Sequence, residues 1–272
     1  MRWGLALICL LVLAAPARAV PLADTPHFLV TCTLSHRAPN DPIVHFGMPG
    51  MSHMHDFFGN STTNAFTTAR KLRHGHTSCH PNGDRSGYWV PSLYVGRRPA
   101  RFASVTVYFE GWPGHTAEVR PFPFGLKLLA GFPMAKHPPK GGAALWSCTG
   151  TGADPLAGSL RIPVCPSYSR VRLDVRFPDC WDGRHLDSRG HRRHMAYSDA
   201  GVCPARAPVL LPRVRFDIEY ATHGARGAVI ASGPGYTAHG DFFNGWRPSL
   251  LSSRIDRCIH GDLRCNFDGQ PY

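Results

Sequence analysis

Two histidines separated by one residue form the sharpest chemical feature of this sequence. His53 and His55 lie in the segment GMSHMHDFFGN. On a β-strand, residues i and i+2 project from the same face, so both imidazoles could reach one metal ion, while Asp56 would point the other way. The alternative is a pair of histidines hydrogen-bonded inside a polar loop. Because neutral imidazole serves both as metal ligand and as general base, we treat the pair as a candidate site.

Two further segments concentrate imidazoles and carboxylates. The segment Pro178–Tyr197 surrounds Cys180 with Asp179, Asp182, His185, Asp187, His191 and His194. The segment Ala238–Trp246 contains His239, Asp241 and Asn244. A disulfide at Cys180 would make the first segment rigid, which suits ligating or catalytic groups because these must be held in place. The alternative for several of the aspartates is turn formation, because Asp-Gly and Asp-Ser steps favour Asx turns.

One hypothesis is an exported enzyme that acts on polysaccharide. Glycoside hydrolysis needs two carboxyl groups facing each other across the scissile bond. The candidate catalytic residues are Asp182, Asp187, Asp241 and His194. The candidate substrate-binding residues are Trp181, Trp246 and Asn244. A lyase would instead use His or Tyr as the base and Arg to neutralise a uronate, which the positive net charge would favour.

A second hypothesis is a divalent metal site built from His53, His55 and His239, with His194 as the alternative third histidine. Asp241 or Asp187 would be a further ligand or a hydrogen-bond partner. Three protein ligands and an open position suit hydrolytic zinc, whereas more oxygen ligands would favour other divalent ions. A third hypothesis makes the protein a non-catalytic binder of cell-wall glycan, with the polar clusters as structural hydrogen-bond networks.

These side chains must be positioned by β-strands, because apolar segments with period-2 alternation recur along the chain. Strands are predicted at Tyr88–Val95, Phe102–Phe109, Val171–Phe177, Val209–Tyr220 and Ala228–Ser232. The single helix predicted is a short one near Leu186–Met195. The expected fold is mainly β: a single-domain, jelly-roll-like antiparallel β-sandwich over residues 20–272, with long disulfide-tied loops.

Composition and the first residues indicate the compartment. The 272 residues include 43% hydrophobic and 11% aromatic residues, which excludes a disordered chain, and 28 Gly with 25 Pro exclude a coiled coil. Residues 1–19 combine a basic start, a short apolar run and small residues before Val20, which predicts a cleaved signal peptide and a secreted, extracellular protein without a transmembrane segment. This cleavage removes Arg2 and Arg18, which lowers the formal net charge from +12 to +10, and it also removes Cys9. No nucleic-acid partner is expected, because no basic helix or glycine-rich phosphate loop accompanies the charge.

Eight cysteines remain after this cleavage, and an even set outside the cytoplasm predicts disulfide bonds. They allow 105 pairings. Proximity in the sequence favours the pairs Cys258 with Cys265, Cys148 with Cys165, and Cys180 with Cys203, which leaves Cys32 for Cys79. Zinc–thiolate binding is the competing interpretation, but no pair has the C-x-x-C spacing.

The motifs, in this order, resemble a family of secreted bacterial and fungal proteins catalogued as a domain of unknown function, some fungal members of which carry a WSC module. The matching segments are SHMH with GN at 52–60, SGYWVPSLY at 86–94, FPDCWDG with LDS at 177–188, HMAY at 194–197 and HGDF with NGW at 239–246. Fungal relatives carry Gln where this chain has Asp56, which argues against a catalytic role for Asp56. The resemblance supports the single-domain organisation and implies no particular reaction.

Overall fold

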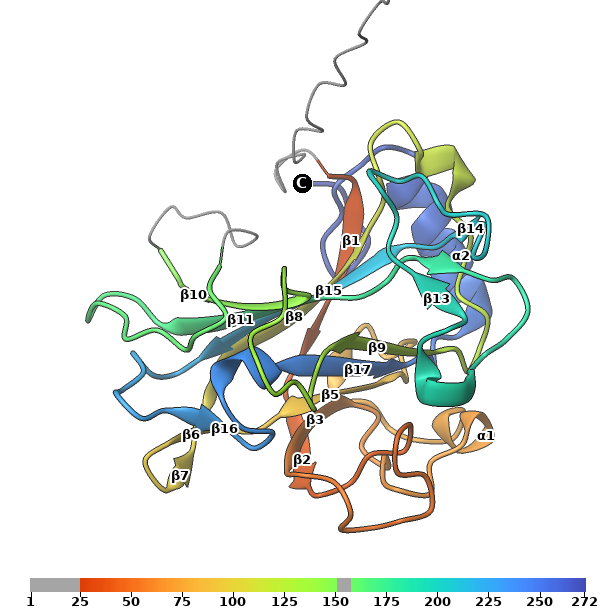
Figure 1. Cartoon of the computed structure of the whole chain (residues 1–272). Helices are drawn as coiled ribbons and strands as arrows, with labels where there is room; N and C mark the ends of the chain where they lie inside the picture. The colour runs from red at the N-terminus through yellow and green to blue at the C-terminus, as the bar shows by residue number, and fades with distance from the viewer. Residues whose placement is uncertain (1–24, 151–157) are drawn as a thin grey trace, which may run out of the picture.

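The computed structural model describes residues 25–150 and 158–272. The predicted signal peptide at 1–19 lies outside them. The fold is mainly β, with 35% strand and 10% helix, and four antiparallel sheets carry the chain (Figure 1). Within the described ranges, no helix is long and apolar enough to cross a membrane.

The two larger sheets contain six and five strands. The six-stranded sheet has the order β10 (Ala144–Cys148), β11 (Val171–Arg176), β15 (Arg213–Tyr220), β8 (Phe102–Glu110), β1 (His27–Cys32) and β4 (Cys79–His80). The five-stranded sheet has the order β2 (Leu34–Ala38), β3 (His55–Gly59), β5 (Gly87–Pro91), β17 (His239–Phe243) and β9 (Lys127–Gly131).

Smaller elements complete the fold. Two three-stranded sheets have the orders β13 (Met195–Ala196), β12 (Cys180–Trp181), β14 (Val209–Leu210) and β16 (Val229–Ile230), β6 (Leu93–Val95), β7 (Arg98–Pro99). The helical elements are α1 (Ala69–Leu72), α2 (Pro248–Arg254), the π-helix η6 (Ile255–Ile259) and the 3-10 turns η2 (Thr116–Glu118), η4 (Arg189–His191) and η5 (Gly235–Thr237). The helix expected near Leu186–Met195 is only the turn η4, because Gly190 takes a left-handed conformation (φ 74°) that interrupts it.

The two larger sheets pack face to face through one apolar core. Tyr88 of β5 meets Phe216 of β15 edge to face, with ring centroids 5.7 Å apart. Phe242 of β17 likewise meets Phe109 of β8 at 6.3 Å. All four rings are fully buried, and such aromatic pairs contribute beyond the area they bury. The predicted antiparallel sandwich is therefore confirmed.

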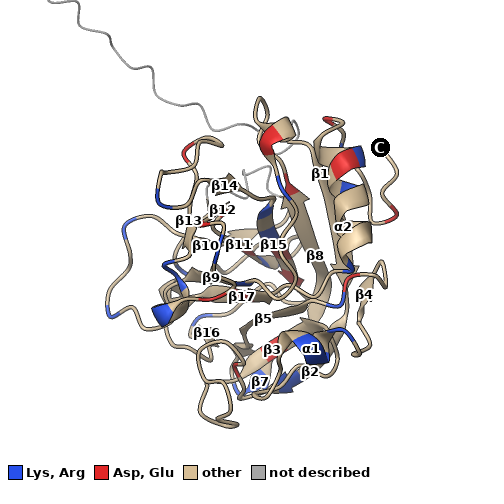
Figure 2. Cartoon of the chain, turned by 90° about the vertical axis from the view of Figure 1, so that its right-hand side faces the viewer, with Lys and Arg blue, Asp and Glu red and all other residues tan. Residues whose placement is uncertain are grey.

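The opposite face of the five-stranded sheet carries a second, smaller apolar cluster. Its members are Ile43, Phe57, Leu72, Trp89, Leu129 and Phe243. Ile43 comes from the loop before β3, and Leu72 comes from α1, so these segments cover this outer face (Figure 1). Figure 2 shows α1 beside β3. The outer face is thus partly buried, which allows polar side chains beside the cluster to be shielded from water.

Disulfide bonds tie the loops and strand ends, as the sequence predicts. The bonds join Cys32 to Cys79, Cys148 to Cys165, Cys180 to Cys203, and Cys258 to Cys265. The first connects the end of β1 to β4, where the two residues are also paired in register. The three pairs favoured by proximity are therefore confirmed, as is the remaining pair of Cys32 with Cys79.

Gly240 of β17 offers a test of the sheet packing. A Cβ at this position would meet Val175, Phe177 and Phe216 at 3.0–3.1 Å. Gly240→Val should therefore overpack the core and lower the free energy of unfolding by about 1–3 kcal/mol, measured by urea denaturation. Ser104→Val, on an exposed position of β8, is the matched control and should change stability by less than about 0.5 kcal/mol. Equal stability of the two variants would contradict the packing described above.

Candidate functional site

Three imidazoles converge on the outer face of the five-stranded sheet. His55 begins β3 and His239 begins β17, while His53 lies in the irregular segment just before β3, outside the strand. His55 pairs with Pro91 of β5, and the register between β5 and β17 continues this row to His239. The two histidines therefore stand two strands apart, roughly 9.5 Å along the sheet, and their side chains lean toward each other above Pro91.

The imidazoles meet through their Nε2 atoms. The Nε2 atom of His239 lies 3.2 Å from that of His53 and 3.2 Å from that of His55. Nδ1 of His55 donates to the carbonyl of Asn40 at 2.9 Å, and Nδ1 of His239 donates to the carbonyl of Thr237 at 2.9 Å. A carbonyl can only accept, so both Nδ1 atoms carry the proton and the neutral rings turn an Nε2 lone pair toward each other.

Burial keeps these rings neutral. It lowers the pKa of His239 to about 3, with a further contribution from His53, and it lowers the pKa of His53 to about 4. The pKa of His55 falls well below its ordinary value, through burial first and then through the neighbouring imidazoles. His53 could carry its proton on Nε2 and donate it to Nε2 of His239. The contact between His55 and His239 would still bring two unprotonated Nε2 atoms together, because both rings carry their proton on Nδ1.

Two buried carboxyl groups adjoin the imidazoles. Asp241, two residues after His239 on the same face of β17, places Oδ2 3.9 Å from Nε2 of His239, and this oxygen has no hydrogen-bond partner among the described residues. Asp41 contributes the second group, and the ligand atoms of Asp41, His55 and Asp241 all lie within 4.8 Å of one another. Burial, and then the charge of Asp41, raises the pKa of Asp241 well above its ordinary value. Oδ1 of Asp41 accepts from the amides of Ile43 and Val44.

This arrangement can hold a divalent cation. Such sites usually consist of histidines that bind the ion through an unprotonated nitrogen, with carboxylates nearby. The other ring nitrogen of each histidine is typically held by a carbonyl, as Nδ1 is here. In tetrahedral coordination with metal–nitrogen bonds of about 2.0–2.1 Å, the nitrogens lie roughly 3.3–3.4 Å apart. The observed 3.2 Å between Nε2 atoms is close to this separation.

Sequence reasoning missed Asp41 and Arg192 at this site. Asp41 belongs to the loop before β3 and has no motif around it, so only the folded loop brings it to His55. Arg192 donates from its guanidinium to the carbonyl of Gly131, at 2.6 Å, beside His239. Burial and then His53 lower the pKa of His239, and the charge of Arg192 lowers it further. The hydrogen bond to the carbonyl of Thr237 acts in the opposite direction. No residue spacing in the sequence signals this contact.

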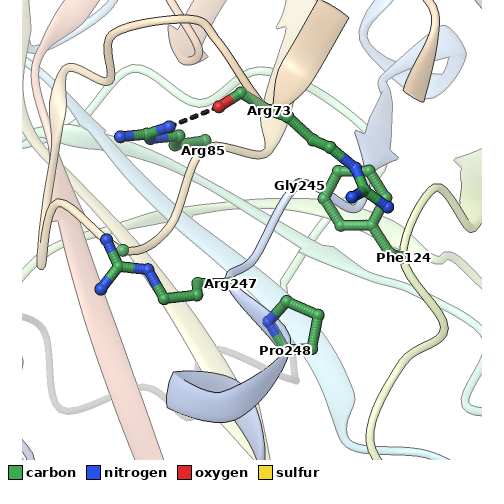
Figure 3. A pocket seen from close by; sticks show the side chains of 7 residues that line it. Arg73, Arg85, Phe124, Gly245, Arg247 and Pro248 are labelled. Carbon is green, nitrogen blue, oxygen red and sulfur yellow. Dashed lines mark hydrogen bonds between the residues drawn. The ribbon is translucent and has the colours of Figure 1, made fainter. Parts of the chain in front are cut away.

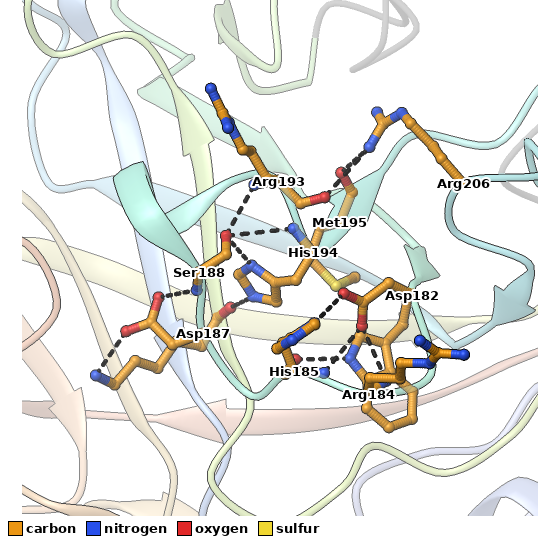
Figure 4. A network of polar contacts seen from close by, with 11 residues as sticks. Asp182, Arg184, His185, Asp187, Ser188, Arg193, His194, Met195 and Arg206 are labelled. Atoms are coloured by element: carbon orange, nitrogen blue, oxygen red, sulfur yellow. Dashed lines mark hydrogen bonds and ion pairs between the residues drawn. The ribbon is translucent and has the colours of Figure 1, made fainter.

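The Asp182–His194 segment forms a separate network of polar contacts (Figure 4). Oδ1 of Asp182 accepts from the amides of Arg184 and His185, and Oδ2 pairs with the His185 ring at 2.6 Å. Burial acts to raise the pKa of Asp182, but hydrogen bonds from His185 outweigh it and hold the pKa below its ordinary value. Asp182 thus forms an Asx turn and is held ionised, which does not suit the acid of a glycosidase.

Asp187 and His194 fasten the same segment to β9. Asp187 binds Nζ of Lys127 at 2.9 Å and the His191 ring at 2.8 Å. Burial acts to raise the pKa of Asp187, and these two partners together hold it below its ordinary value. Buried His194 donates from Nε2 to the carbonyl of Lys127 at 2.8 Å and accepts at Nδ1 from Ser188. All these polar groups have structural partners.

The expected substrate-binding residues lie mostly in the interior. Trp246 is 1% exposed and its ring meets Phe28 and Phe109 edge to face, so it has no free face for a sugar. Asn244 is also 1% exposed and donates to the carbonyl of Pro123 at 2.9 Å. Trp181 is partly exposed and donates to the carbonyl of His185. Of the three, only Trp181 retains accessible surface.

A small cavity of about 190 Å³ on another part of the surface is lined by three arginines (Figure 3). The guanidinium of Arg73 stacks over Phe124 at 4.5 Å, and Arg85 donates to the carbonyl of Arg73. Figure 3 shows the guanidinium groups of Arg85 and Arg247 pointing away from that of Arg73. None of the histidines of the outer face lines this cavity, and its arginines do not converge on one point.

The structural role of His194 can be tested by its removal. His194→Ala should lower the free energy of unfolding by about 1–3 kcal/mol, because it leaves the Lys127 carbonyl and the Ser188 hydroxyl without their buried partner. The measurement is urea denaturation. His185→Ala, which removes an exposed imidazole of the same segment, should cost less than about 1 kcal/mol. If His194→Ala were as stable as the wild-type protein, a structural role would be excluded.

Comparison with known protein families matches residues 41–246 to the family described as "Domain of unknown function (DUF1996)". The match runs from Asp41 to Trp246 and so includes the three histidines, Asp241 and the whole Asp182–His194 segment. No curated protein and no solved structure matches the chain significantly. The chain belongs to the family of the domain of unknown function DUF1996.

Proposed function

We propose that the protein is exported, binds a divalent metal ion through His53, His55 and His239, and acts as a hydrolase or lyase on extracellular polysaccharide. One observation carries the metal site: Nε2 of His55 and Nε2 of His239 face each other at 3.2 Å while each Nδ1 donates to a carbonyl. Two buried lone pairs at this distance repel each other, and a cation shared between them turns the repulsion into two bonds.

The buried carboxyl groups support the same interpretation. An unpartnered carboxylate oxygen in the interior is costly, unless the group is protonated or paired with a cation. Oδ2 of Asp241 is such an atom, and Asp41 lies close to it. Three imidazoles alone would leave an open position on zinc, whereas additional oxygen ligands from Asp41 or Asp241 would favour other divalent ions.

Exposure at one side of the site supports catalysis over a purely structural metal. His55, His239 and Asp241 are buried, but His53 is only partly so. A substrate would therefore approach from the side of His53. A divalent ion bound there would supply Lewis acidity to polarise a substrate oxygen. Asp241 lies beside the histidines, and as a carboxylate next to the bound ion it would accept a proton from the substrate or from water.

Export is supported by the four disulfide bonds together with the signal peptide predicted at residues 1–19. Stable disulfides form in oxidising compartments. Extracellular polysaccharide is proposed as the substrate because an exported hydrolase or lyase meets it there. The second candidate is a non-catalytic glycan binder, which is favoured by the structural contacts that occupy Asp182, Asp187 and His194.

The metal site predicts stoichiometric binding. Untagged protein, incubated with Zn²⁺ or Mn²⁺ and then desalted, should retain about one ion per chain by elemental analysis. His53→Ala should abolish retention, and the ion should no longer raise the melting temperature. His76→Ala removes an exposed imidazole and should behave like the wild-type protein. Retention by His53→Ala equal to that of the wild-type protein would falsify the site, as would no retention by the wild-type protein.

Turnover separates the enzyme from the binder. Soluble and insoluble glycans should release new reducing ends or unsaturated products with the metal-loaded protein, and a chelator or His53→Ala should reduce the rate by at least about 100-fold. Asp241→Asn should also reduce the rate while the fold is retained by circular dichroism. Retention of protein on a glycan without any product supports the binder, and product formation that persists in His53→Ala rejects the metal-dependent enzyme.

A further inference from the structure

A larger cavity of about 450 Å³ lies beside the edge strand β9, near the histidine site. Gly131 of β9 lines the cavity and is paired in register with His239. Arg192 lines it too, and its guanidinium is bound to the carbonyl of Gly131. Arg176, at the end of β11, lines the cavity as well. The cavity therefore connects the end of the six-stranded sheet with the strand next to the histidines.

The cavity has a surplus of positive charge. Arg176, Arg192 and Lys140 line it, and none of the three forms an ion pair with a carboxylate of the described chain. Arg176 makes one long hydrogen bond, 3.4 Å, to the carbonyl of Gly142. Burial, and then repulsion from Arg213, lowers the pKa of Arg176. An anion placed beside Arg176 would stabilise its charged form and so offset both effects.

The other charged groups of the cavity wall are already paired. Arg213 binds Glu110 at 2.7 Å and stacks over Trp112 at 4.3 Å. Oδ2 of Asp179 accepts from the indole of Trp112 at 2.6 Å and from the hydroxyl of Ser198 at 2.7 Å. Asp179 is therefore occupied by neutral donors, so it does not form an ion pair with the three unpaired cations.

Exposed aromatic rings accompany the cations. Phe132 is 50% exposed and lies under the guanidinium of Arg192 at 5.4 Å, and Tyr197 is 51% exposed. Guanidinium groups bind carboxylates through planar paired hydrogen bonds, while aromatic rings pack against the apolar face of a sugar. A ligand that uses both features is a sugar that carries a carboxylate.

We propose that this cavity binds a uronic acid unit of an acidic glycan, with Arg176 and Arg192 on the carboxylate and Phe132 or Tyr197 against the ring. Binding of the uronate to this cavity does not require the metal ion. The proposal rests on the proposed function in one respect: it takes the bound uronic acid to be a unit of the substrate, which makes that polysaccharide a polyuronate. The position of Gly131 next to His239 places the bound sugar beside the histidine site.

The test is calorimetric titration of the mature protein with trisaccharides of galacturonate, mannuronate and guluronate, beside neutral galactotriose and inorganic sulfate. At least one uronate should bind, and Arg176→Ala should weaken it by about tenfold or more, because a hydrogen bond to a charged group is lost. Arg97→Ala, an exposed arginine of the turn between β6 and β7, is the matched control and should leave binding unchanged. Circular dichroism checks that each variant is folded.

Each other result overturns the proposal or separates it from the metal site. No uronate binding, equal binding of galactotriose, or unchanged affinity in Arg176→Ala would each reject the uronate site. Sulfate bound as tightly as the trisaccharide would reject the sugar contact. His53→Ala should lose the metal ion but still bind the uronate, because His53 does not line this cavity. That result supports the uronate site whether or not the metal-dependent reaction passes its own test.

Discussion

The register of the five-stranded sheet is the constraint on which the histidine site depends. β5 lies between β3 and β17, and the pairing of His55 with Pro91 extends across β5 to His239. Strand alternation turns His239 and Asp241 to the outer face, whereas Gly240 and Phe242 face the core. A shift of one residue would exchange these two faces and bury the polar side chains of His239 and Asp241 between the sheets. The sandwich core therefore determines where the polar side chains meet.

A site of this kind is costly to the fold. Buried imidazoles, the unpartnered oxygen of Asp241 and the neighbouring Asp41 all lose water without gaining full hydrogen bonding within the chain. The apolar cluster around Phe57 and Trp89 on the same face, together with the disulfide bonds, offsets this cost. Natural proteins tolerate such local conflicts mainly at functional sites, which agrees with the proposed role in metal binding.

The Asp182–His194 segment, which concentrates imidazoles and carboxylates in the sequence, supports the site instead of forming it. Lys127 holds this segment against β9 in three ways: its amide donates to Leu186, its carbonyl accepts from His194, and its ammonium binds Asp187. The clamp brings Arg192 to the carbonyl of Gly131. Residues that resemble catalytic groups in the sequence thus position an arginine between the histidines and the cationic cavity.

The sequence alone determined the mainly β class, favoured the observed pairing of the cysteines, and predicted opposite faces of one strand for His55 and Asp56. These properties depend on local spacing and on strand periodicity, which can be recognised without a fold. Only the tertiary structure decided that Trp246 and Asn244 are interior, that His194 is fully hydrogen-bonded, and that Asp41 and Arg192 join the histidines. Those outcomes depend on contacts between residues far apart in the chain. The type of a side chain does not show which distant residue will become its partner in the folded protein.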